Sequence, residues 1–224
     1  GVTSAQAAGL GATGIINGKT STEVISATAS GDLGFGLAAG NIQVAGGFEH
    51  RTEKFESISD ELFETGVLLG QGGATPSVKG RYTVSEWFGE ANIPLLADLP
   101  FAQALSLDLA YRYSDYSTAG TTDTYRVGAD WKPVDMFRVR AGYNRAVRAP
   151  NVTELFTTNS LGLWSGSDPC AGATPEYTAA QCANTGVTAA QYGNIGFSPA
   201  GQYNQITGGD LDLDPEQADT ITVG

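Results

Sequence analysis

Basic residues, histidine and long apolar segments are scarce in this sequence. Its 224 residues include 12 Lys and Arg against 24 Asp and Glu, so the formal net charge is −12. Binding to nucleic acid needs clustered Lys and Arg, and this balance therefore argues against a nucleic-acid partner. No apolar run reaches the ~18 residues of a membrane-spanning helix. Helical insertion is thereby excluded, whereas a membrane barrel is not, because its strands show only as alternation.

Residues suited to catalysis are equally few. The sequence has a single histidine, His50, and it contains no nucleophile elbow, zinc-binding helix or Cys–His–Asn arrangement. The segment from Gly11 to Thr20 looks like a phosphate-binding loop, but Thr13 stands where its first glycine is required. We therefore expect no catalytic residue and no bound cofactor.

An acidic run near the end of the chain is similar to the start of a calcium-binding loop. Asp210, Asp212 and Asp214 have the right spacing, but Pro215 and Ile221 occupy the positions that need a glycine and a bidentate glutamate. The run is therefore not an EF-hand, and we predict no metal site. A looser calcium site stays open as an alternative, while entry into a strand is the role that we expect.

The two cysteines, Cys170 and Cys182, lie in an acidic region rich in glycine and alanine. A metal site would need more ligands at short spacing, and His50 is far away in the sequence. We therefore predict a disulfide that closes a short loop, which points to an envelope or extracellular location. In the chain-entropy picture such a link contributes about 3 kcal/mol.

The last third of the chain is acidic. No Lys, Arg or His follows Arg148, but eight acidic residues do: Glu154, Asp168, Glu176, Asp210, Asp212, Asp214, Glu216 and Asp219. Runs of this kind usually form a solvated face, so we expect a negatively charged outer surface here. A vestibule that attracts cations is the alternative.

Most of the chain before Arg148 alternates between apolar and polar residues, which is typical of β-strands. The pattern predicts strands within residues 33–37, 42–51, 82–93, 105–114, 124–131 and 137–144. Short turns are expected at 39–41, 94–101 and 132–136, and longer loops at 57–79 and 149–213. Residues 1–22 are small and polar, and we expect a loop or a weak strand there.

The polar side of these strands carries too many charges for a protein core, namely Arg112, Arg126, Asp130, Arg138 and Arg140. Aromatic residues lie near the strand ends, as in the girdles of membrane barrels; they are Tyr111, Tyr113, Trp131 and Phe137. We therefore predict an all-β, antiparallel transmembrane β-barrel segment, with apolar faces toward lipid and charged faces toward a wet lumen. A soluble sandwich or jelly roll is the alternative.

Two segments in this order resemble a known family. Residues 138–156 form an arginine-rich strand that ends at Ala149-Pro150 and continues into Glu154-Leu155-Phe156, and residues 209–220 contain Leu213-Asp214-Pro215-Glu216. Both are similar to motifs of the TonB-dependent receptors of the bacterial outer membrane, where a late strand leaves for a long external loop and the chain then re-enters the barrel. The resemblance extends over residues 30–224 and is strongest after residue 80.

The resemblance implies a barrel of about 22 strands that is occluded by a plug and driven by TonB. Such receptors import ferric siderophores, cobalamin, haem or oligosaccharides. We expect residues 1–224 to form part of a single barrel domain, with about six or seven strands and without the plug domain and the C-terminal strands. Residues 149–213 would be a long extracellular loop. The expected partners are outer-membrane lipid, the plug, TonB and a small nutrient.

Candidate residues for contact with a ligand or with the plug lie in the lumen and in the loop. They are Arg112, Arg126, Arg138, Arg140, Trp164 and Tyr192. The alternative is that the arginines only hold the plug and that the aromatic residues only pack the loop. Near the start of strand 137–144, we expect Arg138 and Arg140 to face the lumen and Val139 to face lipid.

Three other functions stay open at this point. A passive porin is the nearest, and a plug upstream in the full-length protein would distinguish it from a receptor. A hydrolase would use paired carboxylates such as Glu86 and Glu90, which share one strand face. A soluble binding or adhesion module would stay folded and monomeric without detergent.

Overall fold

The computed structural model describes residues 3–68 and 73–224, which form two compact units. Unit 2 comprises residues 18–57, 78–157 and 209–224, and unit 1 comprises the rest of the described chain. In these described ranges no helix is long and apolar enough to cross a membrane. The elements in chain order are α1 (Ser4–Leu10), β1 (Ile16–Leu37), β2 (Gly40–Ser59), α2 (Glu61–Glu64), β3 (Val78–Leu99), β4 (Ala102–Tyr116), β5 (Gly120–Val134), β6 (Phe137–Arg148), α3 (Val152–Phe156), β7 (Ser160–Ser165), α4 (Ala179–Ala183), β8 (Gln202–Thr207) and β9 (Glu216–Val223).

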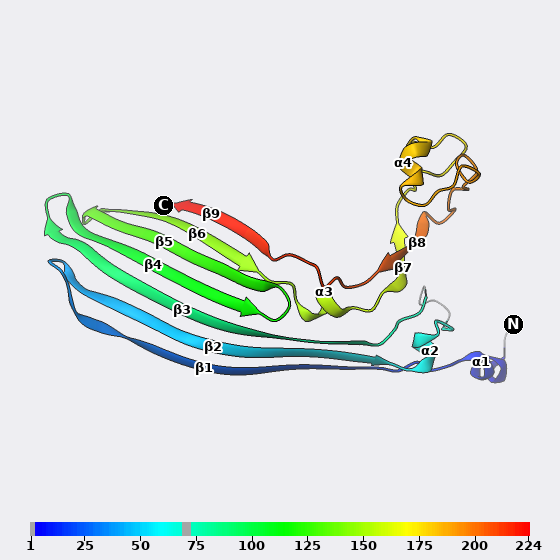
Figure 1. The fold of residues 1–224 in the computed structure, drawn as a ribbon, viewed down its shortest axis with the longest axis horizontal. Helices are drawn as coiled ribbons and strands as arrows, with labels where there is room; N and C mark the ends of the chain where they lie inside the picture. The colour runs from blue at the N-terminus through cyan, green and yellow to red at the C-terminus, as the bar shows by residue number, and fades with distance from the viewer. Residues whose placement is uncertain (1–2, 69–72) are drawn as a thin grey trace. The chain divides into compact units, whose positions relative to one another are not determined.

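Seven strands form one sheet in the order β1-β2-β3-β4-β5-β6-β9 (Figure 1). The pairs from β2 to β9 are antiparallel. The prediction of six or seven antiparallel strands of a barrel is thus confirmed. β1 and β9 lie at the two edges, so the sheet is open in this part of the protein.

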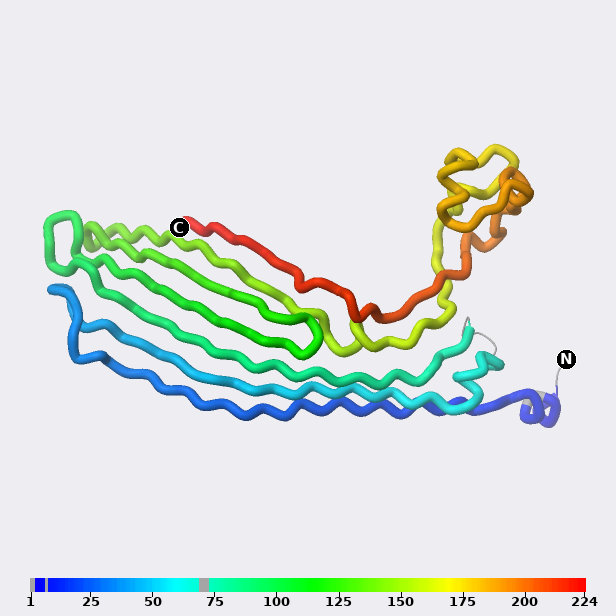
Figure 2. Tube along the Cα trace, viewed as in Figure 1, coloured from blue at the N-terminus to red at the C-terminus, as the bar shows by residue number. Residues whose placement is uncertain are grey.

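Three tight turns lie together at one end of this sheet (Figure 2). They are residues 38–39, 100–101 and 135–136. The opposite ends of the strands lead into the connection 117–119 and into the segment after β6. The end opposite the tight turns therefore carries the long segment after β6, together with the short connection 117–119.

The cross-strand register separates the residues into two faces. Glu90, Ala110, Arg126, Asn144 and Thr220 lie in one row. The next row consists of Ala91, Leu109, Val127, Tyr143 and Ile221. Because side chains alternate along each strand, the even-numbered residues of β4–β6 and β9, and of β3 as far as Asn92, form a polar face. The odd-numbered residues of the same strands form an apolar face.

The strands extend beyond the ranges that the sequence pattern predicts, and two of them, β3 and β5, run through expected turns. The expected turn at 94–101 is mostly strand, because β3 continues to Leu99 and Pro94 lies at a shift of register between β3 and β4. Pro133 lies at a similar shift between β5 and β6. A bulge leaves a residue without a ladder hydrogen bond, and proline has no N–H to donate there. The turns predicted at 94–101 and 132–136 were therefore partly wrong, because the strands continue through both prolines.

Residues 1–22 also contain more structure than expected. Residues 4–10 form α1, and β1 begins at Ile16. The longer loop predicted at 57–79 is shorter, since β2 ends at Ser59 and β3 begins at Val78. α2 starts in this connection, where Asp60 caps its first turn by accepting a hydrogen bond from the Phe63 amide.

Unit 1 includes residues 158–208, which form a hairpin and a short helix. β7 and β8 pair antiparallel, with Trp164 opposite Tyr203. Thr178 and Gln181 form a capping box at the start of α4. A disulfide joins Cys170 to Cys182, as the sequence predicts. The predicted loop 149–213 therefore contains regular elements of its own.

Candidate functional site

The polar face of unit 2 is hollowed. A hollow of about 820 Å³ opens over β2 to β6, and residues that line it include Phe88, Asn92, Asp108, Arg112 and Arg126. A second hollow of about 470 Å³ continues toward β9 and reaches Arg140 and Thr222. Arg126 and Asp108 line both. The alternation of the strands thus places two of the predicted arginines, Arg112 and Arg126, over one continuous polar surface.

Glu86 is the centre of the ion pairs on this face. Its side chain is only 5% exposed. One carboxylate oxygen lies 3.2 Å from Arg112 and 3.8 Å from Arg51, and the other accepts a hydrogen bond of 2.6 Å from the Ser114 hydroxyl. A buried carboxylate is costly unless it is paired and hydrogen-bonded, and all three partners meet this need. The Arg112 guanidinium also lies over the Phe88 ring, 4.9 Å from its centroid.

Asp130 is the ion-pair partner of two other predicted arginines. Arg138 donates hydrogen bonds to both of its carboxylate oxygens, and the Arg140 Nε lies 3.5 Å from one of them. Arg126 differs, because it is exposed and makes no ion pair with any residue in the described part of the chain. Of the four predicted arginines, Arg126 is therefore the one that can pair with a ligand or another domain without breaking an ion pair of the described chain.

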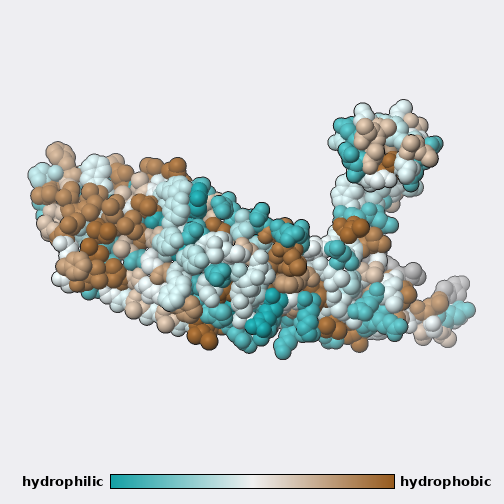
Figure 3. Space-filling view, viewed as in Figure 1, coloured by the Kyte–Doolittle hydropathy of each residue, from teal (hydrophilic) through white to brown (hydrophobic). Residues whose placement is uncertain are grey.

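The apolar face has the opposite character. Between Leu105 and Tyr113 its residues on β4 are all Leu or Tyr, a span of about nine residues, close to the ~9–11 of a tilted transmembrane strand. Trp87 and Val127 on neighbouring strands are 60% and 47% exposed. Figure 3 shows hydrophobic side chains gathered over the end of the sheet that carries the tight turns.

Aromatic residues border this apolar band. Phe48 and Trp87 contact each other at the end far from the tight turns, with ring centroids 4.6 Å apart. Trp131 lies nearer the tight turns, and its indole N–H donates to the Phe101 carbonyl at 3.0 Å. Aromatic side chains with one polar atom are suited to the boundary between hydrocarbon and water. The predicted girdle residue Trp131 therefore occupies a suitable position.

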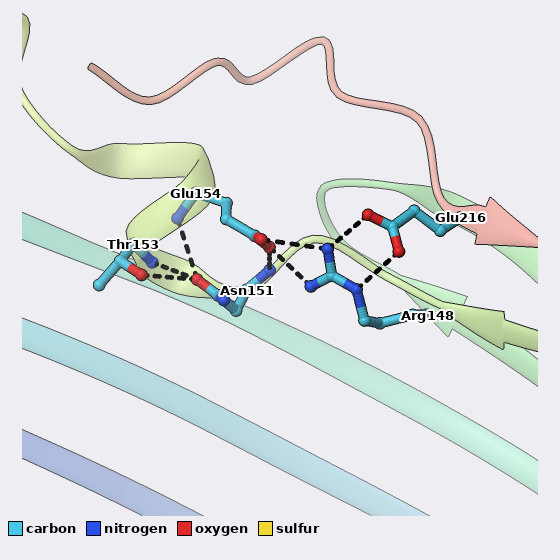
Figure 4. A network of polar contacts seen from close by, with 5 residues as sticks. All are labelled: Arg148, Asn151, Thr153, Glu154 and Glu216. Atoms are coloured by element: carbon cyan, nitrogen blue, oxygen red, sulfur yellow. Dashed lines mark hydrogen bonds and ion pairs between the residues drawn. The ribbon is translucent and has the colours of Figure 1, made fainter. Parts of the chain in front are cut away.

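A network of charges holds the chain where it leaves β6 (Figure 4). Arg148 donates two hydrogen bonds to Glu154, of 3.0 and 3.1 Å, and two to Glu216, of 3.1 and 2.7 Å. We call these three residues the arginine clamp. Glu154 lies in α3 and Glu216 begins β9, so the clamp joins the last residue of β6 to both ends of the long connection. Such bidentate contacts are the stronger kind of ion pair.

Asn151 adds local order to the clamp. Its side-chain oxygen accepts from the amides of Thr153 and Glu154, and its own amide donates to Glu154 at 2.8 Å. Asn151 and Glu154 thereby form a capping box at the start of α3. The Arg148 guanidinium and the Asn151 amide hold the pKa of Glu154 below its usual value. Glu154 therefore stays charged at neutral pH.

The short helix α3 is fixed to the sheet by apolar contacts. Val152 and Leu155 are buried against Tyr82 of β3, and Phe156 packs beside them. Gly80 is needed here, because a Cβ at this position would lie 2.5 Å from the Phe156 ring. The backbone that leads back to β9 also contacts α3, since the Asp210 amide donates to the Glu154 carbonyl at 2.9 Å.

The two predicted loop residues belong to unit 1. Trp164 is 42% exposed and faces Tyr203 with ring centroids 6.0 Å apart. The Tyr192 hydroxyl donates to the Tyr177 carbonyl at 2.9 Å. The Tyr192 hydroxyl is thus engaged within unit 1, whereas Trp164 keeps an exposed ring surface.

The sequence pattern missed the clamp as a unit and Arg51 as a partner of Glu86. Arg148 lies in the first motif, residues 138–156, and Glu216 lies in the second, residues 209–220. Their places in these two motifs are the only feature of the sequence that connects them. No group of His, Cys, Asp or Glu in residues 3–68 and 73–224 is arranged to hold a metal ion.

The model of the family described as TonB dependent receptor-like, beta-barrel matches residues 3–224. No curated protein and no solved structure matches the chain. The matched residues include both faces of the sheet, the clamp and the disulfide.

Proposed function

The chain belongs to the β-barrel family of TonB-dependent receptors, and we propose that it serves the energised uptake of a scarce nutrient across the bacterial outer membrane. The observation that carries this proposal is the pair of faces on the same strands. A charged, hollowed face suits a water-filled lumen, and an exposed apolar face with aromatic borders suits lipid. Ferric siderophores, cobalamin, haem and oligosaccharides are the nutrient classes that we propose to test.

The orientation follows from the connections between strands. In membrane barrels the periplasmic turns are short and the external loops are long. We therefore assign the end with turns 38–39, 100–101 and 135–136 to the periplasm. Residues 149–213 then form an extracellular loop that is available for nutrient capture.

Within the lumen we propose that Arg126 contacts the nutrient or the plug. Arg112 is engaged by Glu86, and Arg138 and Arg140 by Asp130. Arg126 is exposed at the junction of the two hollows. A charge-assisted hydrogen bond contributes about 1.5–3 kcal/mol, which corresponds to about 10- to 100-fold in binding.

The test uses the full-length receptor in cells that lack its gene. Uptake of labelled ferric siderophores, cobalamin, haem and maltooligosaccharides is measured with and without a functional TonB. We expect one class to enter only when both the receptor and TonB are present. Entry that is independent of TonB would instead indicate a passive porin.

Arg126→Ala tests the luminal site. It should lower the uptake or the plug association by about 10-fold or more. Arg145→Ala is the matched control, because Arg145 lies on the apolar face and pairs with Asp219 at 2.9 Å. Equal loss in both variants would argue against a specific role of Arg126.

A further inference from the structure

The β7–β8 hairpin of unit 1 is a small two-stranded sheet (Figure 1), and its side chains alternate between two faces. The residues of one face are Ser160, Gly162, Trp164, Tyr203, Gln205 and Thr207. We call it the aromatic face of the hairpin. The other face carries Leu161, Leu163 and Ile206, which are exposed. The aromatic face therefore combines flat rings with uncharged hydrogen-bonding groups, whereas the opposite face presents aliphatic side chains.

The Trp164 ring is held in place by its own strand and by β8. The indole lies against Gly166, because a Cβ there would be 2.5 Å from the ring atoms Cη2 and Cζ2. Tyr203 faces it from β8 at a centroid distance of 6.0 Å, and the Tyr203 hydroxyl accepts a hydrogen bond of 3.3 Å from the Ser198 amide. Trp164 still remains 42% exposed. A fixed aromatic ring that keeps exposed surface loses little entropy when a ligand stacks on it.

Uncharged polar groups lie beside this ring. Gly162 precedes Trp164 on the same face of β7 and has no side chain to cover the surface. Gln205 lies opposite Gly162, and Thr207 follows on the same face of β8. The Thr207 hydroxyl oxygen would be 3.4 Å from a Cβ at Gly162. An amide and a hydroxyl, which both donate and accept hydrogen bonds, thus border a flat area next to the indole.

The segment around this face is almost free of charge. Residues 158–208 contain Asp168 and Glu176 but no Lys, Arg or His. Asp168 is engaged locally, since its carboxylate accepts from the Cys170 amide at 2.8 Å. An anionic ligand would lose hydration here without gaining a cationic partner, and the aromatic face itself has no carboxylate to pair with a cation. The face therefore selects against charged iron chelates and haem and favours a neutral ligand.

We propose that the aromatic face binds one sugar ring of a neutral oligosaccharide. A hexose ring has a side of C–H groups, which stacks on the π-face of an indole, and a rim of hydroxyls, which pair with amides and hydroxyls. Trp164 contacts the C–H side, and Gln205 and Thr207 bind hydroxyls at its edge. The inference rests on the proposed nutrient uptake and names oligosaccharides as its substrate class.

The experiment measures sugar binding by calorimetry on the purified full-length receptor in nanodiscs, without TonB. The probes are three neutral sugars, maltohexaose, cellohexaose and xylohexaose, and the anionic hexagalacturonate. We expect a neutral sugar to bind, and hexagalacturonate to bind at least about 10-fold more weakly. Trp164→Ala should weaken binding of the neutral sugar at least about 10-fold. Leu161→Ala is the matched control, because Leu161 is 54% exposed on the opposite face of the same strand.

Gly166→Ala tests the position of the Trp164 ring and keeps the ring itself. The added methyl group displaces the indole, so we expect binding to weaken by about 5- to 10-fold. Gly196→Ala adds the same group where no heavy atom lies within 4 Å apart from the chain neighbours, and it should bind like wild type. Blocked alkylation of Cys170 and Cys182 shows that their disulfide has formed in each variant.

Equal binding by wild type and Trp164→Ala would overturn the proposal. Equal binding of hexagalacturonate would do the same, and so would failure of all three neutral sugars to bind at about 10 mM. Uptake of the same sugars is measured in cells with and without TonB. Sugar binding with TonB-independent entry contradicts the proposed transport and leaves this inference valid. TonB-dependent entry of another nutrient without sugar binding contradicts this inference alone.

Discussion

On the polar face of β3 to β6 the charged side chains mostly meet partners of opposite charge, whereas the apolar face of the same strands leaves large side chains exposed. Glu86 and Arg112 represent the first face, 3.2 Å apart with the carboxylate buried. Trp87, the neighbour of Glu86 in the chain, is 60% exposed on the second. Consecutive residues of one strand therefore differ in the way that the proposed contact with water on one face and lipid on the other requires.

On β4–β6 and β9 charges do appear on the apolar face, and they lie toward the end that we assign to the cell exterior. Asp123, Arg145 and Asp219 lie level with or beyond Tyr111. Arg145 donates two hydrogen bonds of 2.9 Å to Asp219, which also accepts from the Tyr143 hydroxyl. The aromatic border therefore separates a charge-free band from a zone in which polar groups are allowed and paired.

The largest expected effect is the difference in stability between adding a charge to the apolar face and adding it to the polar face at the same height. Leu109→Arg puts a guanidinium in the middle of the apolar band and should cost about 2–4 kcal/mol. Ala110→Arg, one residue further, adds the same group to the hollowed polar face and should cost only about 0–1 kcal/mol. Urea titration of the full-length receptor in lipid vesicles measures both. Similar losses would contradict the assignment of the two faces.

A second test asks whether the ion pair on the polar face is energetically coupled. Arg112→Met leaves the buried Glu86 carboxylate with the more distant Arg51, and we expect a loss of about 1–3 kcal/mol. Glu86→Gln should remove most of that penalty in the double variant, because no buried charge remains. A double-mutant cycle in the same urea assay should give a coupling of about 0.5–3 kcal/mol. Additive effects would mean that solvent, not Arg112, satisfies Glu86.

A third test addresses polar atoms at the border of the apolar face. Trp131→Phe removes the N–H that donates to the Phe101 carbonyl, and we expect a loss of about 0.5–1.5 kcal/mol. Trp87→Phe makes the same chemical change and keeps an aromatic ring against Phe48, so its cost should be smaller. The urea midpoint of each variant provides the comparison. The reverse order would show that Trp131 acts through ring area alone.

The sequence predicts well which residues share a face of the sheet. Side chains alternate between the two faces along a strand, and this alternation needs no information on distant residues. Leu109, Arg112 and Arg126 could be assigned by counting, and the observed register agrees. The turn predicted at 94–101 was mostly wrong, because the bulge next to Pro94 depends on the partner strand. The clamp was missed for the same reason, since Arg148 meets Glu216 only after a long excursion of the chain. Arg126 was predicted to face the lumen, and it lies on the polar face, but its lack of an ion pair in the described chain depends on neighbours that the sequence does not reveal.

The smallest expected effect lies where the two faces end, at the arginine clamp. The pKa of Glu154 is lowered by Arg148 and by the Asn151 amide. A depressed pKa means that the favourable contribution is present above the unfolded value of about 4.3 and is lost as the pH falls through the folded pKa. Acidification below about pH 4.3 should therefore loosen the base of the long connection, while the sheet stays intact.

Amide hydrogen exchange of the full-length receptor measures this loosening at Gly209 and Asp210. Their amides donate to the carbonyls of Thr157 and Glu154 at 2.7 and 2.9 Å. Glu154→Gln should raise their exchange already at neutral pH and reduce the acid-dependent increase, because Glu216 is then the one carboxylate of the clamp that is left to protonate. Glu61→Gln makes the same change in α2 and should leave both amides protected. If wild type and Glu154→Gln respond equally to acid, another group controls the loop, and the clamp is only a packing contact at the rim of the polar face.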